Sequence, residues 1–292
     1  IENKVLQRDG KTFIIAEAGV NHGGNMDLAK QLVDIAVDAG VDAVKFQAFR
    51  TSELIIQNVK KAPYQTKTTD KAESQSDMLK KLELQKEQYI ELKEYCQKKN
   101  IIFLITPFDE TSLKELEEIG VVAYKVASTD TTNLPFLKKI AQTKKPIFLS
   151  TGMSYLEEIR SALTEIFTYN KDVVLMQCTA NYPIQYDEAN LNVINTFQEN
   201  FNILTGYSDH SIGIGAAPYA LPMGVCMIEK HFTINKADEG PDHLASLDPK
   251  ELKELVREVR RIEKFLGSFE KVPTASELKT RKSLQKNLVA KT

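Results

Sequence analysis

The chain has 292 residues, of which 42% are hydrophobic and 27% charged, enough to bury a substantial core as one large domain or two small ones. Its formal net charge of −2, with lysine and arginine spread along the whole length, offers no basic stripe and argues against nucleic acid as a partner. No apolar run is long enough to span a bilayer, no signal-peptide pattern opens the chain, and three widely spaced cysteines argue against a disulfide framework, so we expect a cytoplasmic protein.

Two hydrophobic periods alternate along the chain. The first strand, 12–19, becomes polar at its C-terminal end, and the helix at 25–39 carries an apolar stripe and stops at Gly40. The same reading predicts further strands at 41–48, 101–108, 122–128, 146–151, 173–179, 203–209 and 226–232. It predicts further helices at 76–99, 111–119, 134–142, 155–167, 191–199, 214–221 and 249–266.

About eight strand and helix pairs in roughly 250 residues match a closed parallel (β/α)8 barrel, the TIM barrel, in count and size. The strands are near-continuous apolar runs, as expected of strands buried on both faces. An open doubly wound sheet is the alternative, but residues 19–24 do not fit the Gly-x-Gly-x-x-Gly turn that would follow its first strand. We therefore predict one barrel over residues 1–266.

Two segments do not fit the repeat. Residues 51–75 form a polar connection that is too long for an ordinary loop between a strand and a helix, so we expect a lid or a substrate-contacting excursion. Residues 267–292 are basic and weakly periodic, which is typical of a linker.

Polar residues gather at the predicted C-terminal strand ends, where the chemistry of such barrels takes place. Lys45 and Lys125 each lie inside an apolar strand, and a lysine is costly to bury unless it meets an anion. The hydroxyl groups expected beside them belong to Thr106, Ser128, Ser150 and Ser208. Together they predict a cradle for a phosphate and a carboxylate. The alternative is that each lysine reaches the surface and pairs with a nearby carboxylate.

Two histidines follow successive strands near the end of the barrel. His210 has Asp209 beside it, and Glu229 lies near His231. Two imidazoles without a cysteine partner leave coordination positions open, so the pattern favours a catalytic Mn, Mg, Co or Zn ion over a structural one. The alternative for each is an ordinary hydrogen-bonded histidine. Cys178 and Cys226 are expected to pack as small hydrophobic residues, and His22 and His243 either contact ligand or make loop hydrogen bonds.

Several segments together resemble the sialic acid synthase family, whose members condense phosphoenolpyruvate with an N-acetylated hexosamine. The segments that carry the resemblance cover the chain in order: 17–24, 44–49, 106–108, 124–128, 149–153, 207–211, 229–233 and 240–247. Residues 240–247 and 274–277 are most similar to bacterial N-acetylneuraminate synthases.

The resemblance implies a function for most of the residues singled out above. It implies a divalent cation, usually manganese with magnesium or cobalt as alternatives, held by His210 and His231. It implies a phosphoenolpyruvate site at Lys45, Thr106, Lys125, Ser128, Ser150 and Ser208, and sugar contacts at Glu17, Gln47, Tyr182 and Asp242. Within this set it implies catalytic roles for Glu17, Lys45 and Lys125, joined by Asp130.

The chain departs from the family pattern at three places. Many members have Ser-Gly-Glu after the second lysine strand, whereas this chain has Asp130, one methylene shorter, at the glutamate position. Ala180 stands where some relatives have a phosphate-contacting asparagine. Members also have a C-terminal antifreeze-like domain, which in a head-to-tail homodimer contributes an arginine to the partner's sugar site. We expect residues 267–292 to lead toward such a domain.

The resemblance implies N-acetylneuraminate synthase activity: phosphoenolpyruvate, N-acetylmannosamine and water give N-acetylneuraminate and phosphate by C–O bond cleavage. A synthase that makes legionaminate or pseudaminate from a 6-deoxy diacetamido hexose is the alternative within enzymes. A non-catalytic barrel that binds a sugar or phosphate is an alternative of another class. A Schiff-base aldolase that uses either lysine is more distant, because it leaves the histidine pair without a role.

Overall fold

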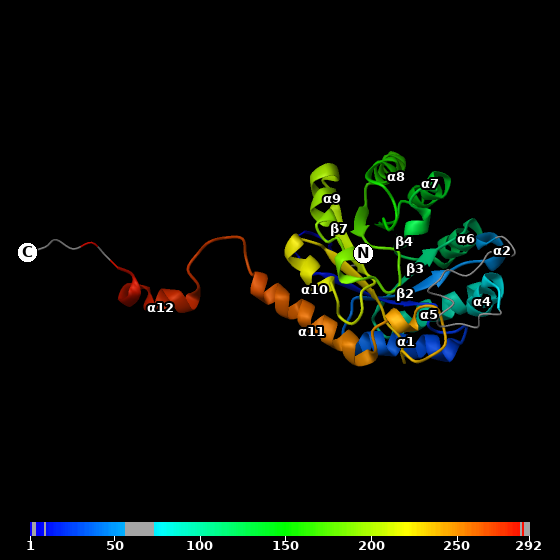
Figure 1. The fold of residues 1–292 in the computed structure, drawn as a ribbon, viewed down its shortest axis with the longest axis horizontal. Coiled ribbons are helices and arrows are strands. Elements are labelled where there is room, and N and C mark those ends of the chain that lie inside the picture. Colours follow the sequence, from blue (N-terminus) through cyan, green and yellow to red (C-terminus); the bar gives the residue numbers. More distant parts are fainter. Residues whose placement is uncertain (2–3, 9, 56–72, 287, 289–292) are drawn as a thin grey trace, which may run out of the picture.

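Eight parallel strands form a single sheet in the computed structural model, which describes residues 1, 4–8, 10–55, 73–286 and 288. The larger helices lie around the outside of the strands (Figure 1). The strands are β1 (Phe13–Gly19), β2 (Ala43–Ala48), β3 (Ile102–Pro107), β4 (Tyr124–Val126), β5 (Ile147–Ser150), β6 (Val173–Gln177), β7 (Leu204–Asp209) and β8 (Met227–His231).

The strand order confirms the predicted barrel. It runs β3-β2-β1-β8-β7-β6-β5-β4, so the first strand of the chain pairs with the last. This pairing excludes the open doubly wound sheet. Among the described strands no hydrogen-bond ladder joins β3 to β4, and the three-residue β4 leaves the barrel nearly closed there.

The inward-facing residues change from apolar to polar along the strands, because alternate residues point to the same face. The apolar side chains inside the barrel are Phe13, Ile15, Ala43, Ile102, Leu104, Ala123, Phe148, Val174, Met176, Cys226 and Met227. Further along the same strands, the next residue that faces inward is in most cases polar. These residues are Glu17, Lys45, Thr106, Lys125, Ser150, Cys178 and Glu229. The polar groups at the C-terminal end therefore rest on an apolar floor.

A larger core lies between the strands and the helices. The longer helices around the barrel bury one apolar stripe there, as α1 does with Leu32, Val33 and Ala36. The helices are α1 (Met26–Ala39), α2 (Thr51–Leu54), α4 (Gln75–Leu82), α5 (Lys86–Lys98), α6 (Glu110–Ile119), α7 (Leu134–Gln142), α8 (Leu156–Tyr169), α9 (Val193–Phe201), α10 (Ala217–Ala220), α11 (Pro249–Leu266) and α12 (Ala275–Leu284).

Most predicted elements agree with the structure to within two residues at each end, but the continuous helix at 76–99 was wrong. The chain forms α4 and α5 instead, separated by residues 83–85. The carboxylate of Glu83 accepts hydrogen bonds from the backbone N of Thr51 at 3.0 Å and from its Oγ1 at 2.9 Å. Gln85 and Gln88 then form a capping box that starts α5. Local periodicity cannot reveal a break that depends on a residue 32 positions away.

The predicted helix at 214–221 was also too long. Gly213 and Gly215 have φ values of 63° and 49°, a left-handed conformation that a helix cannot contain. The helical part is α10, followed by a single 3₁₀ turn at Leu221–Met223. The excursion predicted at 51–75 opens with α2, and its residues 56–72 lie outside the described part.

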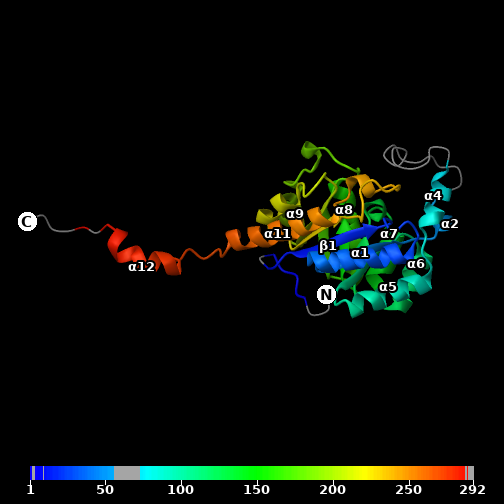
Figure 2. The same ribbon diagram turned by 90° about the horizontal axis from the view of Figure 1, so that it is seen from below.

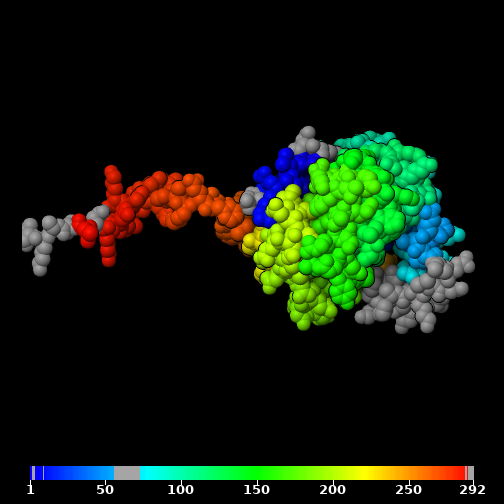
Figure 3. All heavy atoms as spheres, turned by 90° about the horizontal axis from the view of Figure 1, so that it is seen from above, coloured from blue at the N-terminus to red at the C-terminus, as the bar shows by residue number. Residues whose placement is uncertain are grey.

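The C-terminal segment contains a helix that its weak periodicity did not predict. Thr274 and Glu277 form a capping box at the start of α12, and no residue of α12 is buried. Figures 1 and 2 show α12 beyond the end of α11, and Figure 3 shows it separated from the surface of the barrel. None of the described helices has the length and apolar character needed to cross a membrane.

Candidate active site

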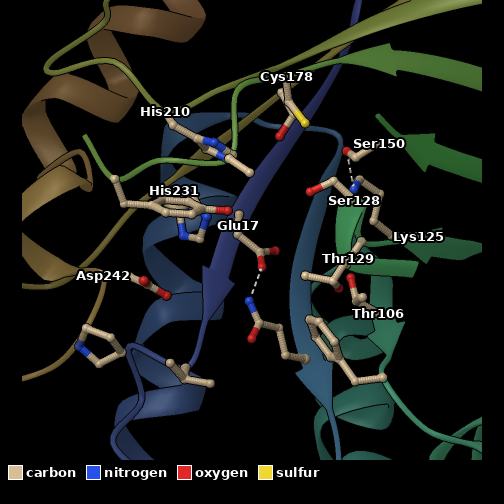
Figure 4. A pocket seen from close by; sticks show the side chains of 18 of the residues that line it. Glu17, Thr106, Lys125, Ser128, Thr129, Ser150, Cys178, His210, His231 and Asp242 are labelled. Atoms are coloured by element: carbon tan, nitrogen blue, oxygen red, sulfur yellow. Dashed lines mark hydrogen bonds between the residues drawn. The ribbon is translucent and has the colours of Figure 1, made fainter. Parts of the chain in front are cut away.

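The polar strand ends surround a cavity of about 520 Å³ (Figure 4). Its walls come from the C-terminal ends of the strands and from the loops that follow them. All predicted site residues except Asp130 line it: Glu17, Lys45, Gln47, Thr106, Lys125, Ser128, Ser150, Tyr182, Ser208, His210, His231 and Asp242.

Lys45 reaches the cavity from β2. Its Nζ lies 2.7 Å from Glu17 Oε2 and donates a hydrogen bond to Thr106 Oγ1 at 3.0 Å. Burial acts to lower the pKa of Lys45, but the carboxylates of Glu17 and Glu229 outweigh it and raise that pKa. Lys45 therefore remains a charged ammonium inside the protein.

Lys125 approaches the same region from β4. It donates to Ser150 Oγ at 2.6 Å and to the Val126 carbonyl oxygen at 3.1 Å. Burial lowers the pKa of Lys125. Both lysines are 3% exposed, so the alternative interpretation was wrong in expecting them at the surface, although it was right that Lys45 pairs with a nearby carboxylate. The structure thus brings the two lysines and their hydroxyl partners together; their role in anion binding remains a prediction.

Glu229 is the main residue of the cavity to which the sequence analysis assigned no site role. Its Oε1 lies 3.6 Å from Lys45 Nζ and 3.9 Å from Lys125 Nζ, and it accepts a hydrogen bond from Ser208 Oγ at 3.3 Å. Burial acts to raise the pKa of Glu229, but the two lysines outweigh it and lower that pKa. The sequence did contain a signal for its place in the cavity, because alternate residues of β8 face the same side and Glu229 stands two residues before His231.

Glu17, which pairs with Lys45, is also hydrogen-bonded to Gln47. Gln47 Nε2 donates to Glu17 Oε1 at 3.1 Å, drawn as a dashed line in Figure 4. Burial raises the pKa of Glu17 to about 7, although Lys45 opposes the shift. Glu17 is therefore suited to hold or release a proton near neutral pH.

The two histidines lie close together, with ring centroids 5.6 Å apart; His210 directly follows β7, and His231 is the last residue of the neighbouring β8. The Nδ1 of His210 lies 2.6 Å from the Thr179 carbonyl oxygen, which assigns the proton to Nδ1 and leaves Nε2 unprotonated. Asp209, which is next to His210 in sequence, accepts a hydrogen bond from Lys230 at 2.8 Å. Burial lowers the pKa of His210 to about 4 and that of His231 well below its usual value, so both rings are neutral.

Neutral imidazoles are the form that binds metal ions. The buried Nδ1 of His231 has no hydrogen-bond partner. No group of three or more His, Cys, Asp or Glu side chains suited to a metal occurs in the described part of the chain. An ion held by two protein ligands keeps positions for substrate and water, as in catalytic sites. The pair therefore fits a divalent cation, and manganese, magnesium or cobalt remains a prediction.

Tyr182 and Asp242 lie on the same side of the cavity as the histidines. The Tyr182 ring centroid is 4.1 Å from that of His210 and 5.5 Å from that of His231. Burial raises the pKa of Asp242 to about 6. Figure 4 shows Asp242 beside His231, on the opposite side of the cavity from Lys125. Both residues line the cavity, and their role as sugar contacts remains a prediction.

Asp130 lies behind the cavity wall. Its Oδ1 accepts a hydrogen bond from Asn133 Nδ2 at 3.1 Å, while its neighbours Ser128 and Thr129 line the cavity. The structure thus does not bring Asp130 together with the other predicted residues, and its catalytic role remains a prediction. Ala180 does line the cavity.

Gly152 allows Ser128 to take its position. A Cβ on Gly152 would lie 2.3 Å from both Cβ and Oγ of Ser128, and its φ of 40° is also unfavourable for other residues. Any side chain at this position would therefore displace Ser128 from the cavity wall.

The remaining histidines and cysteines make structural contacts, with one exception. The backbone N of Gly24 donates to His22 Nδ1 at 3.0 Å, and Thr233 Oγ1 lies 2.6 Å from His243 Nδ1. Neither histidine lines the cavity, which agrees with loop hydrogen bonding. Cys226 packs inside the barrel as predicted. Cys178 lines the cavity instead.

An apolar wall, which the sequence analysis did not identify, covers the side of the cavity that follows β2 and β3. We call Phe49, Leu54, Ile55, Leu79 and Phe108 the apolar wall. A polar network anchors its helices, since the Arg50 backbone N donates to Asp109 Oδ2 at 2.7 Å and its guanidinium pairs with Glu83 at 3.3 Å and Glu115 at 2.5 Å.

Several known proteins are similar to this chain over most of its length. The NeuB family model matches residues 32–271. N,N'-diacetyllegionaminic acid synthase of Campylobacter jejuni is 47% identical over 96% of this chain and 85% of that protein. The synthase of the same name from Legionella pneumophila is 44% identical over 94% of this chain and 79% of that protein. The N-acetylneuraminic acid synthetase structure from Leptospira borgpetersenii, in complex with citrate, has a TM-score of 0.87 at 37% identity, and covers 98% of this chain and 97% of that one.

Proposed function

We propose, because this chain belongs to the NeuB family, that it joins phosphoenolpyruvate to an N-acylated hexosamine and releases a nonulosonic acid and phosphate. One observation carries the proposal beyond family membership. Two buried ammonium groups and two neutral imidazoles, from β2, β4, β8 and the residue that follows β7, face a single cavity. The ammonium groups suit an anionic substrate, and the imidazoles suit a cation that activates a carbonyl group.

Phosphoenolpyruvate would occupy the side of the cavity that holds the lysines. Lys45 and Lys125 supply the positive charge for its phosphate and carboxylate. The hydroxyl groups available to donate hydrogen bonds belong to Thr106, Ser128, Ser150 and Ser208. Holding both substrates in fixed positions lowers the entropic cost of bringing them to reacting distance.

The bond changes follow from the substrates. C3 of phosphoenolpyruvate bonds to C1 of the open-chain sugar, water adds at C2, and the C–O bond between C2 and the phosphate breaks to leave the keto acid. His210 and His231 would hold a divalent cation, which would supply the Lewis acidity needed to polarise the aldehyde oxygen of the sugar. Glu17 and Gln47 hold the sugar opposite C3, and the two lysines retain the phosphate as its charge grows.

Two observations favour a 6-deoxy diacetamido hexose as the sugar, and hence legionaminate as the product. The two legionaminic acid synthases are 47% and 44% identical to this chain, whereas the N-acetylneuraminic acid synthetase is 37% identical. The apolar wall also suits the methyl groups that such a sugar carries on C6 and on its second acetamido group.

N-acetylmannosamine is the second candidate, and its product would be N-acetylneuraminate. The observation in its favour is the TM-score of 0.87 with the Leptospira borgpetersenii N-acetylneuraminic acid synthetase. The two sugars differ at the end remote from the aldehyde, so the same reacting groups serve both.

Phosphate release with manganese, phosphoenolpyruvate and each sugar in turn tests the proposal, with product mass as a second measurement. We expect kcat/KM to be about tenfold or more higher for the 6-deoxy diacetamido hexose, because a methyl group in an apolar pocket contributes about that much discrimination. A preference for N-acetylmannosamine would establish the second candidate. Absence of phosphate release with every sugar would favour the non-catalytic binding barrel.

A further inference from the structure

Glu229 occupies a central position between the two lysines of the cavity. It lies on β8 two residues before His231, so its side chain points into the barrel, and it is 4% exposed. Its Oε1 is within 4.0 Å of both ammonium groups, at 3.6 Å from Lys45 and 3.9 Å from Lys125. Its Oε2 is buried and has no hydrogen-bond partner.

The two lysines depend on Glu229 to different degrees. Lys45 has a second and closer carboxylate, Glu17, at 2.7 Å. In the described part of the chain Glu229 is the one carboxylate within 4.0 Å of Lys125, whose other partners are the Ser150 hydroxyl and the Val126 carbonyl oxygen. Without Glu229, Lys125 would be a buried ammonium with neutral partners only.

Charge balance explains why a carboxylate stands at this position. Two buried ammonium groups repel each other, and a buried charge without a counter-ion is strongly destabilising. In the protein without ligand, Glu229 supplies a negative charge close to both lysines, and Glu17 supplies a second one to Lys45 when it is ionised. Any anion that binds the lysines must then approach Glu229, and like charges at such distances in a buried site repel strongly.

We infer that Glu229 is a positioning residue that acts as the resident counter-ion of Lys45 and Lys125 until an anionic substrate takes its place. Its carboxylate attracts both ammonium groups and so keeps them on the same side of the cavity. The inference rests on the anion-binding half of the proposed function and is independent of which sugar is used. It has two opposite consequences: Glu229 stabilises the free protein, and it weakens the binding of anions.

Glu229→Gln tests both consequences, because glutamine keeps the shape and removes the charge. We expect a lower melting temperature for the variant without ligand and about tenfold tighter binding of inorganic phosphate and of phosphoenolpyruvate, measured by calorimetry. Saturating phosphate should raise the melting temperature of the variant more than that of the wild type. A purely structural role would lower the melting temperature without tightening phosphate binding, and that result would overturn the inference.

Two further variants complete the experiment. Glu115→Gln removes a carboxylate that pairs with Arg50 outside the cavity, so it should lower the melting temperature and leave phosphate affinity unchanged. Glu229→Asp keeps the charge and should bind phosphate within about threefold of the wild type. If Glu229→Gln does not fold, phosphate binding by Glu229→Asp that is tenfold tighter than in the wild type would contradict the inference. Wild-type phosphate binding without turnover would count against the proposed reaction and leave the inference intact.

Discussion

At the scale of single residues, burial determines the chemical state of the site, and Asp242 shows this most directly. Burial raises its pKa from 3.8 to about 6, so the folded protein favours the protonated carboxyl. A raised pKa contributes stability that is fully present below the unfolded value and is lost as the pH rises through 6. At pH 8 the charged Asp242 therefore destabilises the fold, by up to about 3 kcal/mol.

Asp242→Asn should remove this penalty. We expect its melting temperature to exceed that of the wild type by about 3–6 °C at pH 8 and the difference to shrink at pH 5, where the wild-type carboxyl is largely protonated. Thermal unfolding at both pH values measures the effect. A difference that is the same at pH 5 and pH 8 would show that Asp242 does not titrate in this range. Activity should fall in the variant, since Asp242 is a proposed sugar contact.

The histidine pair leads to a prediction about metal binding. His231→Ala should weaken Mn²⁺ binding by well over tenfold and abolish metal-dependent turnover, because even the loss of a residue that supports a metal ligand costs 10–100-fold. Electron paramagnetic resonance of free Mn²⁺ measures the affinity without reference to activity. His243→Ala is the matched control, since His243 is buried and does not line the cavity. Full activity of His231→Ala in metal-free buffer would refute the metal assignment.

At the scale of elements, period-two alternation explains how much of the site could be predicted. The polar strand ends identified Lys45 and Lys125, and the strand order then placed them in one cavity. Glu229 was interpreted as a neighbour of His231, although the alternation that placed His231 inside the barrel places Glu229 there too. Asp130 follows β4 closely in sequence but lies in a 3₁₀ turn and does not line the cavity, and nearness in sequence to a strand end does not reveal this difference.

The apolar wall could not be predicted, because it depends on contacts between distant segments. Leu54 and Leu79 lie on α2 and α4, and Glu83 joins these helices through its hydrogen bonds to Thr51. Sequence periodicity describes each helix separately and does not contain this contact. The predicted excursion at 51–75 identified the right region without its structure.

Leu79→Asn should reduce sugar discrimination. A polar side chain in the wall no longer favours the methyl groups of the 6-deoxy diacetamido hexose, so we expect its kcat/KM relative to N-acetylmannosamine to fall about tenfold. The KM for phosphoenolpyruvate should stay constant, because the lysines lie elsewhere in the cavity. Leu82→Asn makes the same substitution on the same helix away from the cavity and should keep the wild-type ratio. Equal ratios in the two variants would exclude the wall as a determinant of specificity.

At the scale of the whole molecule, the barrel supplies every described group of the site, and the segment after Leu266 supplies none. The strands and the residues directly after them contribute the floor, the lysines and the histidines, while α2, α4 and the adjoining loops contribute the apolar wall. α12 buries no residue, and Phe269 and Leu284 are 90% and 76% exposed. The anion-binding half of the site should therefore be independent of this segment.

A chain that ends at Leu266 tests this independence. We expect its melting temperature to lie within about 2 °C of that of the 292-residue chain and its phosphate affinity to be unchanged, because the described residues after Leu266 are all exposed. Light scattering of both chains would reveal whether residues 267–292 contribute to the predicted homodimer. The melting temperature alone does not answer this question, because it measures stability and not the mass of the assembly. A melting temperature lowered by more than about 5 °C would mean that this segment packs against the barrel in solution, since a difference of that size requires about 1–3 kcal/mol of lost contacts.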